Sequence, residues 1–198
     1  MTFDEFIDTY DKPGSIILLL GKRKVPENER RLLTELGRKL AGASEHILFR
    51  GGNAEGADQL FASAVSLVNS DRMEVVTPYT GHRQEHSQQF RTVSLDQVDL
   101  ASEPDITYHS KLDKKSRNLI TDYEKGHKSK YANYGAYLLR NTLMVVGAKG
   151  LNVPKASFAI FYDDLKKPGD GGTGFTMKVC TSAGVPFIDQ RMWLDWLK

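Results

Sequence analysis

Short apolar runs alternate with segments of helical periodicity along most of this chain. The runs are rich in Ile, Leu, Val and Phe, and they cover residues 15–20, 46–49, 73–77, 157–162 and 185–188. Strands that are buried on both faces of a parallel sheet have this composition. Apolar residues recur at the spacing of a helix face over residues 27–40, 58–68, 134–146 and 176–183. The alternation predicts an α/β fold with a doubly wound, mostly parallel, Rossmann-like sheet of about five strands.

Length and composition narrow the class of protein. The 198 residues suit a single domain, 1–198, that carries an insertion. The single cysteine, Cys180, excludes an internal disulfide and is expected as a small buried residue. The net charge of +2 gives no general attraction to nucleic acid or membrane. No apolar stretch approaches the ~20 residues of a membrane helix and the N-terminus is acidic, so a cytoplasmic protein without a membrane partner is expected.

Residues 99–133 differ from the rest of the chain, because they are polar and contain few large apolar side chains. Between residues 111 and 130, seven Lys/Arg stand against three Asp/Glu. This basic segment is predicted to be an insertion or lid between the third predicted strand and the third predicted helix. Two interpretations stay open, namely a solvated surface segment and a basic cover over an anionic ligand.

The run RGGNAEGAD at residues 50–58 joins a predicted strand to a predicted helix through a glycine turn. Gly51, Gly52 and Gly56 would let the backbone approach a ligand closely. A helix N-terminus presents unpaired N–H groups and partial positive charge, which suits a phosphate. Asp58 would cap the new helix by accepting N–H bonds, which is a structural alternative to a role in binding.

A second glycine turn, GDGGTG at residues 169–174, also stands between an apolar run and a helical segment. In doubly wound sheets, ligands bind beyond the carboxyl ends of the strands. Both turns are expected at that edge, where their backbone N–H groups would face the same space. Two such turns in one α/β chain predict a nucleotide-type ligand.

Basic side chains are expected near the same edge. The first predicted strand ends in GKRK at residues 21–24, where Arg23 either meets a phosphate or is solvated. Arg140 and Asn141 lie within an apolar predicted helix. A buried arginine needs a partner, so either a ligand phosphate or an internal carboxylate is expected beside Arg140.

Signatures of metal sites and of common catalytic machinery are weak. The acidic pair at 163–164 can bind a ribose hydroxyl or a metal, or it is solvated. His82 and His86 are four residues apart, but no third ligand accompanies them, so no metal site is predicted. No Gly-x-Ser-x-Gly elbow and no Walker-type signature occurs, which argues against serine hydrolase and ATPase chemistry. No cofactor is predicted.

Several motifs together resemble the SLOG superfamily, which includes DprA-like Rossmann proteins and LOG-type phosphoribohydrolases. FRGGNAEGADQLF at 49–61 looks like the GG-x-x-x-G-A-D turn of that group. VTPYTG at 76–81 and LRNTLMVVG at 139–147 are similar to the PW-x-G segment and the RN-x-x-x-VLG helix of small phage and bacterial members. GGTG at 171–174 and GVPFI at 184–188 resemble their closing pair of motifs. The resemblance implies a nucleotide-binding, Rossmann-like fold with the ligand at the two glycine turns.

LOG-type enzymes cut the N-glycosidic bond of a nucleoside monophosphate with an Arg and with the Glu of a PGG-x-GT-x-x-E motif. Here Phe175 stands where the motif has Thr, and Lys178 stands where it has Glu. A carboxylate at that place would stabilise the positive charge that develops on the ribose, whereas a lysine opposes it. An alternative function as a LOG-like N-glycosidase therefore needs Glu55 or Asp163 as its carboxylate.

DprA-like members bind single-stranded DNA, which needs an extended basic groove with aromatic rings for stacking. The basic residues of 111–130, with Tyr108, Tyr123 and Tyr131, make single-stranded nucleic acid a further candidate partner. The tail that contains Trp193 and Trp196 is expected to be a short packing helix, or part of a homodimer surface.

The leading hypothesis is a nucleotide-binding protein without assigned catalysis. Backbone N–H groups of both glycine turns would hold the phosphate, and Arg50 or Arg140 would neutralise its charge. The predicted nucleotide-binding residues are Gly21, Arg23, Arg50, Gly51, Gly52, Asn53, Gly56, Asp58, Arg140, Asn141, Gly171, Gly172, Thr173 and Gly174.

Overall fold

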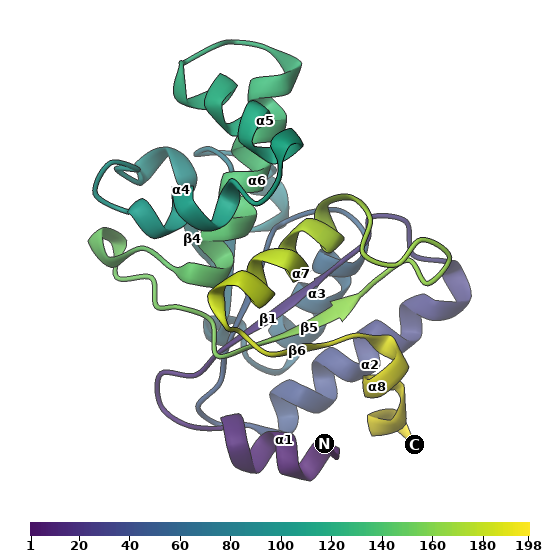
Figure 1. Cartoon of the computed structure of the whole chain (residues 1–198). Helices are drawn as coiled ribbons and strands as arrows, with labels where there is room; N and C mark the ends of the chain where they lie inside the picture. The colour runs from purple at the N-terminus through teal and green to yellow at the C-terminus, as the bar shows by residue number, and fades with distance from the viewer.

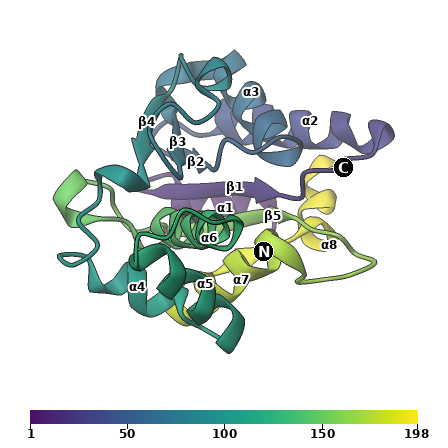
Figure 2. The same ribbon diagram turned by 90° about the horizontal axis from the view of Figure 1, so that it is seen from above.

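A computed structural model describes residues 1–198 and contains one parallel sheet with helices on both faces (Figures 1 and 2). The six strands lie in the order β4-β3-β2-β1-β5-β6, and each neighbouring pair is parallel. The strands are β1 (Ile16–Gly21), β2 (Leu48–Gly51), β3 (Met73–Thr77), β4 (Arg91–Ser94), β5 (Phe158–Tyr162) and β6 (Phe187–Ile188). The predicted α/β fold class is confirmed, with one strand more than the five expected.

The additional strand is β4, at one edge of the sheet. Its sequence is RTVS, and only its last two residues are buried. An edge strand with a solvated end does not need a continuous apolar run, so the pattern that identified the other strands is absent here. All five residues of β3, by contrast, are buried.

The order of the strands reverses beside β1. The chain adds β2, β3 and β4 on one side of β1, and then returns to place β5 and β6 on the other side. Right-handed crossovers then place the helices of the two halves on opposite faces of the sheet, as Figure 2 shows for α2 and α3 against α6 and α7. The switch point lies between the carboxyl ends of β1 and β5, which is where sheets of this kind bind ligands.

The helices expected from periodicity are present, and the structure adds others. The expected helices are α2 (Glu27–Ala43), α3 (Ala57–Asn69), α6 (Lys130–Val146) and α7 (Gly171–Ala183). The additional helices are α1 (Phe3–Tyr10), α4 (Pro104–Ser110) and α5 (Lys114–Glu124), and the short helix expected in the tail is α8 (Gln190–Trp193). Local capping explains where two of them begin: Thr2 with Glu5, and Asp113 with Ser116, form reciprocal capping boxes.

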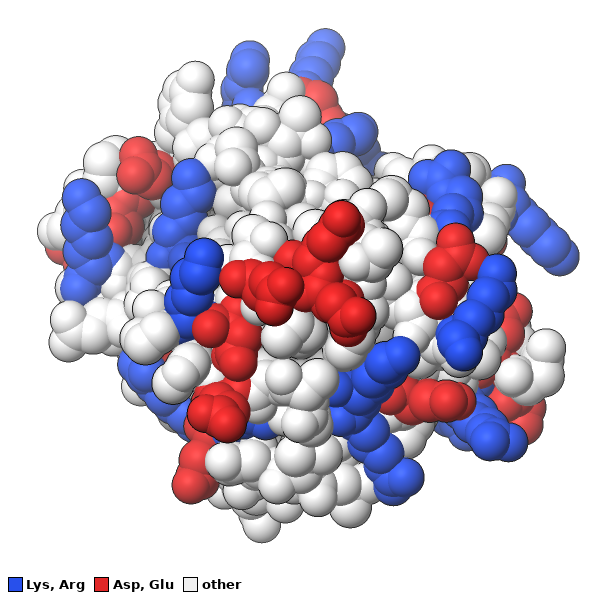
Figure 3. All heavy atoms as spheres, turned by 90° about the horizontal axis from the view of Figure 1, so that it is seen from below, with Lys and Arg blue, Asp and Glu red and all other residues white.

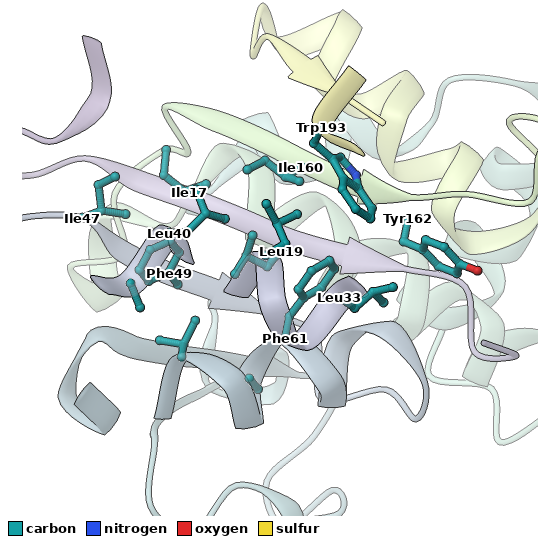
Figure 4. Packing of buried hydrophobic residues seen from close by; sticks show 14 of the residues in the cluster. Ile17, Leu19, Leu33, Leu40, Ile47, Phe49, Phe61, Ile160, Tyr162 and Trp193 are labelled. Carbon is teal, nitrogen blue, oxygen red and sulfur yellow. The ribbon is translucent and has the colours of Figure 1, made fainter. Parts of the chain in front are cut away.

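One hydrophobic core lies between the sheet and the layer that contains α1, α2, α3 and α8. Leu33 and Leu40 of α2 and Phe61 of α3 pack toward Ile17 and Leu19 of β1 (Figure 4). All five side chains are fully buried. Since side chains alternate along a strand, the residues of β1 next to Ile17 and Leu19 point to the opposite face of the sheet.

The second core lies on that opposite face and includes Leu18 and Leu20 of β1. Leu139 and Leu143 of α6 are fully buried against it. Cys180 of α7 belongs to the same core, and burial raises the pKa of its thiol to about 12. The prediction of a small buried cysteine is confirmed.

The C-terminal tail packs into the first core. Trp193 is 0% exposed and Trp196 is 5% exposed. The indole N–H of Trp193 donates to the carbonyl oxygen of Phe161 at 2.9 Å. The predicted packing role is confirmed, because both rings are buried within their own chain, and the homodimer stays a prediction.

Residues 99–133, which were expected to be a polar insertion or lid, fold into α4, α5 and the first turn of α6 at the top of Figure 1. Ile106 and Ile120 of this segment are fully buried in the second core. The segment therefore packs a few buried side chains into the helical layer while most of its residues stay at the surface, and its role as an insertion or lid stays a prediction.

Charges of both signs cover the face that Figure 3 shows, with acidic side chains gathered near its centre. α1 lies at the bottom of Figure 1 and carries the exposed side chains of Asp4, Glu5 and Asp8. A polyanion needs a continuous basic surface, and this face does not offer one. No helix of the fold has both the length and the apolar character needed to cross a bilayer.

Candidate ligand-binding site

A cavity of about 860 Å³ lies at the switch point, outside the carboxyl ends of β1 and β5. The loop after β1, the start of α3, α5, α6, the loop after β5 and the N-terminus of α7 all contribute to its wall. Predicted site residues in this wall are Gly21, Arg23, Asp58, Arg140, Asn141, Gly171, Gly172 and Thr173. Residues separated by about 150 positions in the sequence therefore meet here, as expected for the carboxyl edge of a doubly wound sheet.

The first glycine turn is filled by a side chain of the protein itself. A Cβ atom on Gly52 would lie 1.7 Å from Nη1 of Arg140 and 2.8 Å from Oδ2 of Asp58. The same Nη1 donates to the carbonyl oxygen of Gly52 at 2.7 Å. Gly52 is thus required for the close approach of a guanidinium group. The prediction that its backbone faces a phosphate directly is wrong, because Arg140 occupies that space.

Asp58 joins the first turn to the end of β1. Gly56 is the N-cap residue of α3, so the expected capping role of Asp58 is not the one observed. Its Oδ1 instead accepts a hydrogen bond from the backbone N–H of Gly21 at 2.9 Å. Burial raises the pKa of this carboxyl group, while the positive charge of Arg140 and the bond from Gly21 act in the opposite direction. Asp58 fixes the geometry of the cavity wall.

Arg140 is the central charged residue of the wall. It is 5% exposed, and its Nε atom is buried without a hydrogen-bond partner. It forms no ion pair within 4.0 Å. Burial lowers the pKa of its guanidinium, and the carboxylate of Asp58 is the main influence against that shift. Of the two partners expected for Arg140, the internal carboxylate acts only at longer range, and the contact with Gly52 leaves the group incompletely satisfied.

The second glycine turn is open. The helix α7 begins at Gly171, and the side chain of Asp170 caps the N–H of that residue at 2.8 Å. A Cβ atom on Gly172 would meet only Nδ2 of Asn141, at 3.7 Å. The same Nδ2 donates to the carbonyl oxygen of Gly172 at 3.3 Å. Arg140 thus bonds to the first glycine turn, and its neighbour Asn141 bonds to the second. Only the second glycine turn leaves space for a ligand.

Gly174 is needed for a different reason. A Cβ atom at this position would lie 1.8 Å from the carbonyl oxygen of Gly169. The residue therefore allows the loop before α7 to close tightly, and it does not line the cavity.

Arg50 does not reach the cavity, and its predicted role in neutralising a phosphate is wrong. The side chain is 0% exposed, and its Nε donates to Oε1 of Glu74 at 2.6 Å. Its Nη1 donates to the carbonyl oxygens of Met144 and Pro154 at 2.8 Å each. Through these three bonds Arg50 ties β2 to β3 and to the end of α6, although its Nη2 is buried without a hydrogen-bond partner.

The other predicted residues of the first turn shape the loop and lie outside the cavity wall. Gly51 is the last residue of β2 and is buried. Asn53 has a φ of 53°, and its Nδ2 donates to the carbonyl oxygens of residues 82–83 at 3.1 Å. Gly56 has a φ of 85°, and a Cβ atom there would lie 2.0 Å from the carbonyl oxygen of Arg23. Both positive φ angles explain why the sequence has Asn and Gly at these places.

The two carboxylates considered for catalysis are both directed elsewhere. Glu55 pairs with Arg83 at 3.1 Å on the surface. Asp163 is 3% exposed, and its Oδ2 accepts a hydrogen bond from the N–H of Gly169 at 2.8 Å. Neither residue lines the cavity, whereas Asp164 does. The structure therefore offers no support for Glu55 or Asp163 as the carboxylate of a LOG-like reaction.

Aromatic residues of α6 are the main part of the wall that sequence reasoning missed. Tyr131, Tyr134 and Tyr137 line the cavity. Tyr131 and Tyr134 are 67% and 51% exposed, so their rings are accessible. Of the three tyrosines that the sequence predicts for stacking, Tyr131 lines the cavity, whereas Tyr108 and Tyr123 do not. The spacing of three residues along one helix was the signal that could have identified the set.

The balance of charge in the cavity is positive. Six basic and four acidic side chains line it. Nζ of Lys22 lies 3.9 Å from Oδ1 of Asp164 and 5.1 Å from the centre of the Tyr162 ring. Arg23 lies over the ring of Tyr137 at 6.0 Å. An excess of cations inside a concave site attracts an anionic ligand.

Comparison with known proteins finds a solved structure with a similar fold. The sequence matches no protein-family model and no curated protein. A solved structure of DNA processing protein A (DprA) from Helicobacter pylori has a similar fold, with a TM-score of 0.55 and 14% sequence identity. The match covers 95% of this chain and 68% of that chain. The chain has a DprA-like fold.

The Helicobacter pylori protein binds single-stranded DNA. At 14% identity the likeness extends to the fold alone. It agrees with the DprA-like part of the resemblance drawn from the glycine motifs. The ligand of the present chain has to be argued from its own cavity.

Proposed function

We propose that the cavity binds a nucleotide, with a phosphate of the nucleotide at the N-terminus of α7. One observation carries this proposal: an open helix N-terminus and a buried arginine with an unpartnered Nε–H lie in the same cavity wall. A desolvated arginine with an unsatisfied N–H group favours an anion, and the first turn of a helix favours the same group.

The phosphate would lie beside Gly172 and Thr173. Their N–H groups belong to the first turn of α7, where the backbone has no intrahelical partner. Arg23 and Arg140, which line the same cavity, supply positive charge. The nucleoside would extend along α6 toward Tyr137. In this arrangement α5, from the 99–133 segment, forms one wall over the ligand.

A panel of nucleotides tested by thermal shift and calorimetry checks the proposal. A ligand at 100 times its dissociation constant adds about 2.7 kcal/mol to the free energy of unfolding. For a chain of this size that gain should raise the melting temperature by roughly 5–10 °C. A panel in which no nucleotide raises the melting temperature or releases heat would refute the proposal.

The Gly172→Val variant makes the test specific. Its side chain would enter the space proposed for the phosphate, while only Nδ2 of Asn141 lies within 4 Å of the new Cβ atom. We expect a folded protein that no longer binds nucleotide. Gly42→Val in α2 is the matched control, because no atom lies within 4 Å of a Cβ there and the residue is outside the cavity. Unchanged affinity in Gly172→Val would show that the phosphate lies elsewhere.

Single-stranded DNA is the second candidate ligand, because the accessible rings of Tyr131 and Tyr134 line the same cavity as Lys115. Aromatic rings with neighbouring cations are the elements from which single-strand binding sites are built. Fluorescence anisotropy with a labelled oligonucleotide at several salt concentrations tests this candidate. Binding that weakens steeply with salt, together with a flat nucleotide panel, would favour it over the nucleotide.

A further inference from the structure

The cavity is divided along α6 into two parts of different chemistry. The inner part contains Arg140 and Asn141 beside the glycine turns, and the outer part contains Tyr131 and Tyr134. At 1.5 Å per residue, Tyr137 is about 4.5 Å from Arg140 along the helix axis, and Tyr131 is about 14 Å from it. A nucleotide whose phosphate lies at α7 can place its base near Tyr137 or Tyr134. The ring of Tyr131 then lies beyond that base.

The outer part has the composition of a site for a second ring. Leu119 of α5 also lines the cavity, at the level of Gly135 of α6, where a Cβ atom would lie 2.3 Å from the carbonyl oxygen of Leu119. Tyr131 is 67% exposed, so most of its side chain is free to contact a ligand. The cavity volume of about 860 Å³ is near the upper end of the range of roughly 300–1,000 Å³ for ligand sites. The space and the apolar lining both exceed what a phosphate site requires.

We infer that the ligand is a dinucleotide, in which the second base stacks on Tyr131 in the outer part of the cavity. This inference rests on the proposed function, since the phosphate at α7 fixes where the first nucleotide lies. The link between the two nucleotides adds a further negative charge, and Lys115 and Lys178 in the wall provide positive charge for it. Each base has a π-face, so stacking on a tyrosine holds the second ring without requiring a particular base.

The test compares four adenine ligands by calorimetry: AMP, pAp, the 5′-phosphorylated dinucleotide pApA, and the ten-residue strand pA10. The ligand pAp adds charge without a second base, so it separates electrostatics from stacking. Stacking of one base on an aromatic ring should make pApA bind roughly 5- to 150-fold more tightly than pAp. The Tyr131→Ala variant should lose this advantage, whereas Tyr131→Phe should keep it.

Tyr108→Ala is the matched control, because Tyr108 is 74% exposed and lies outside the cavity wall. It should leave the affinities of all four ligands unchanged. Equal affinity for pAp and pApA, or an advantage of pApA that persists in Tyr131→Ala, would overturn the inference while AMP binding keeps the proposed function intact. Failure of all four ligands to bind would overturn both. Much tighter and strongly salt-dependent binding of pA10 would also overturn it, in favour of an extended strand.

Discussion

Replacing Gly52 by alanine tests whether Arg140 is held in the first glycine turn. The new Cβ atom would lie 1.7 Å from Nη1 of Arg140 and 3.0 Å from its Cζ. Ordinary contacts begin at about 3.4 Å, so the guanidinium group must move by more than an ångström. It would then lose the 2.7 Å hydrogen bond to the carbonyl oxygen of Gly52.

The expected cost follows from that lost contact. A hydrogen bond from a charged group contributes about 1.5–3 kcal/mol to stability. In a domain of this size, 1 kcal/mol corresponds to about 2–4 °C in melting temperature. Gly52→Ala should therefore lower the melting temperature by roughly 3–12 °C, and it should also weaken nucleotide binding because Arg140 is displaced from the wall.

Differential scanning calorimetry of Gly52→Ala against Gly172→Ala measures the effect. The second variant places the same methyl group in the open turn, where the nearest atom is 3.7 Å away, so its melting temperature should stay close to that of the unmodified protein. If the two variants have the same melting temperature, Arg140 does not occupy the first turn. A lowered melting temperature of Gly172→Ala would contradict the assignment of the second turn as the open one.

Three further outcomes are expected. Arg50→Met should lower the free energy of unfolding by up to about 3–5 kcal/mol in a urea titration, since the buried Glu74 then keeps only its ion pair with the half-exposed Arg91, while nucleotide affinity stays unchanged. Asp11→Ala should cost about 1–2 kcal/mol in the same assay, because its carboxylate accepts backbone N–H bonds from residues 45–47. Burial, with the nearby arginines, lowers the pKa of His82 below 6.5, so the unfolded chain binds the proton more readily. The contribution of neutral His82 to the free energy of unfolding is therefore present above pH 6.5 and is lost as the pH falls below 6.5. The His82→Gln variant should show a smaller fall in melting temperature over that pH range.

The sequence predicted the parts of the fold that depend on local pattern. Continuous apolar runs identified β1, β3 and β5, because strands inside a parallel sheet are buried on both faces. The same rule missed β4, where only the last two residues are buried. Helical periodicity did not identify α4 and α5, because most of their residues are polar and only a few, such as Ile106 and Ile120, are buried apolar residues.

The candidate cavity lies at the edge of the sheet that the sequence predicted, although several predicted residues make other contacts. Motif spacing placed Gly172, Arg140 and Asn141 at the carboxyl edge of the sheet, and all three line the cavity. Arg50 was assigned to the ligand because it adjoins the glycine turn, but its side chain is directed to Glu74. The direction of a side chain at the end of a strand depends on which partners surround it, and those partners lie on other elements.

What the sequence determined by itself was the doubly wound fold and the edge at which two glycine turns meet, because periodicity and turn residues act over short stretches of chain. Only the tertiary structure decided which turn can take a ligand. Arg140 fills the first turn from a position 88 residues away, and Asn141 leaves the second turn open. Whether a backbone turn is filled depends on packing between residues that are distant in the sequence, so a local sequence pattern cannot predict it.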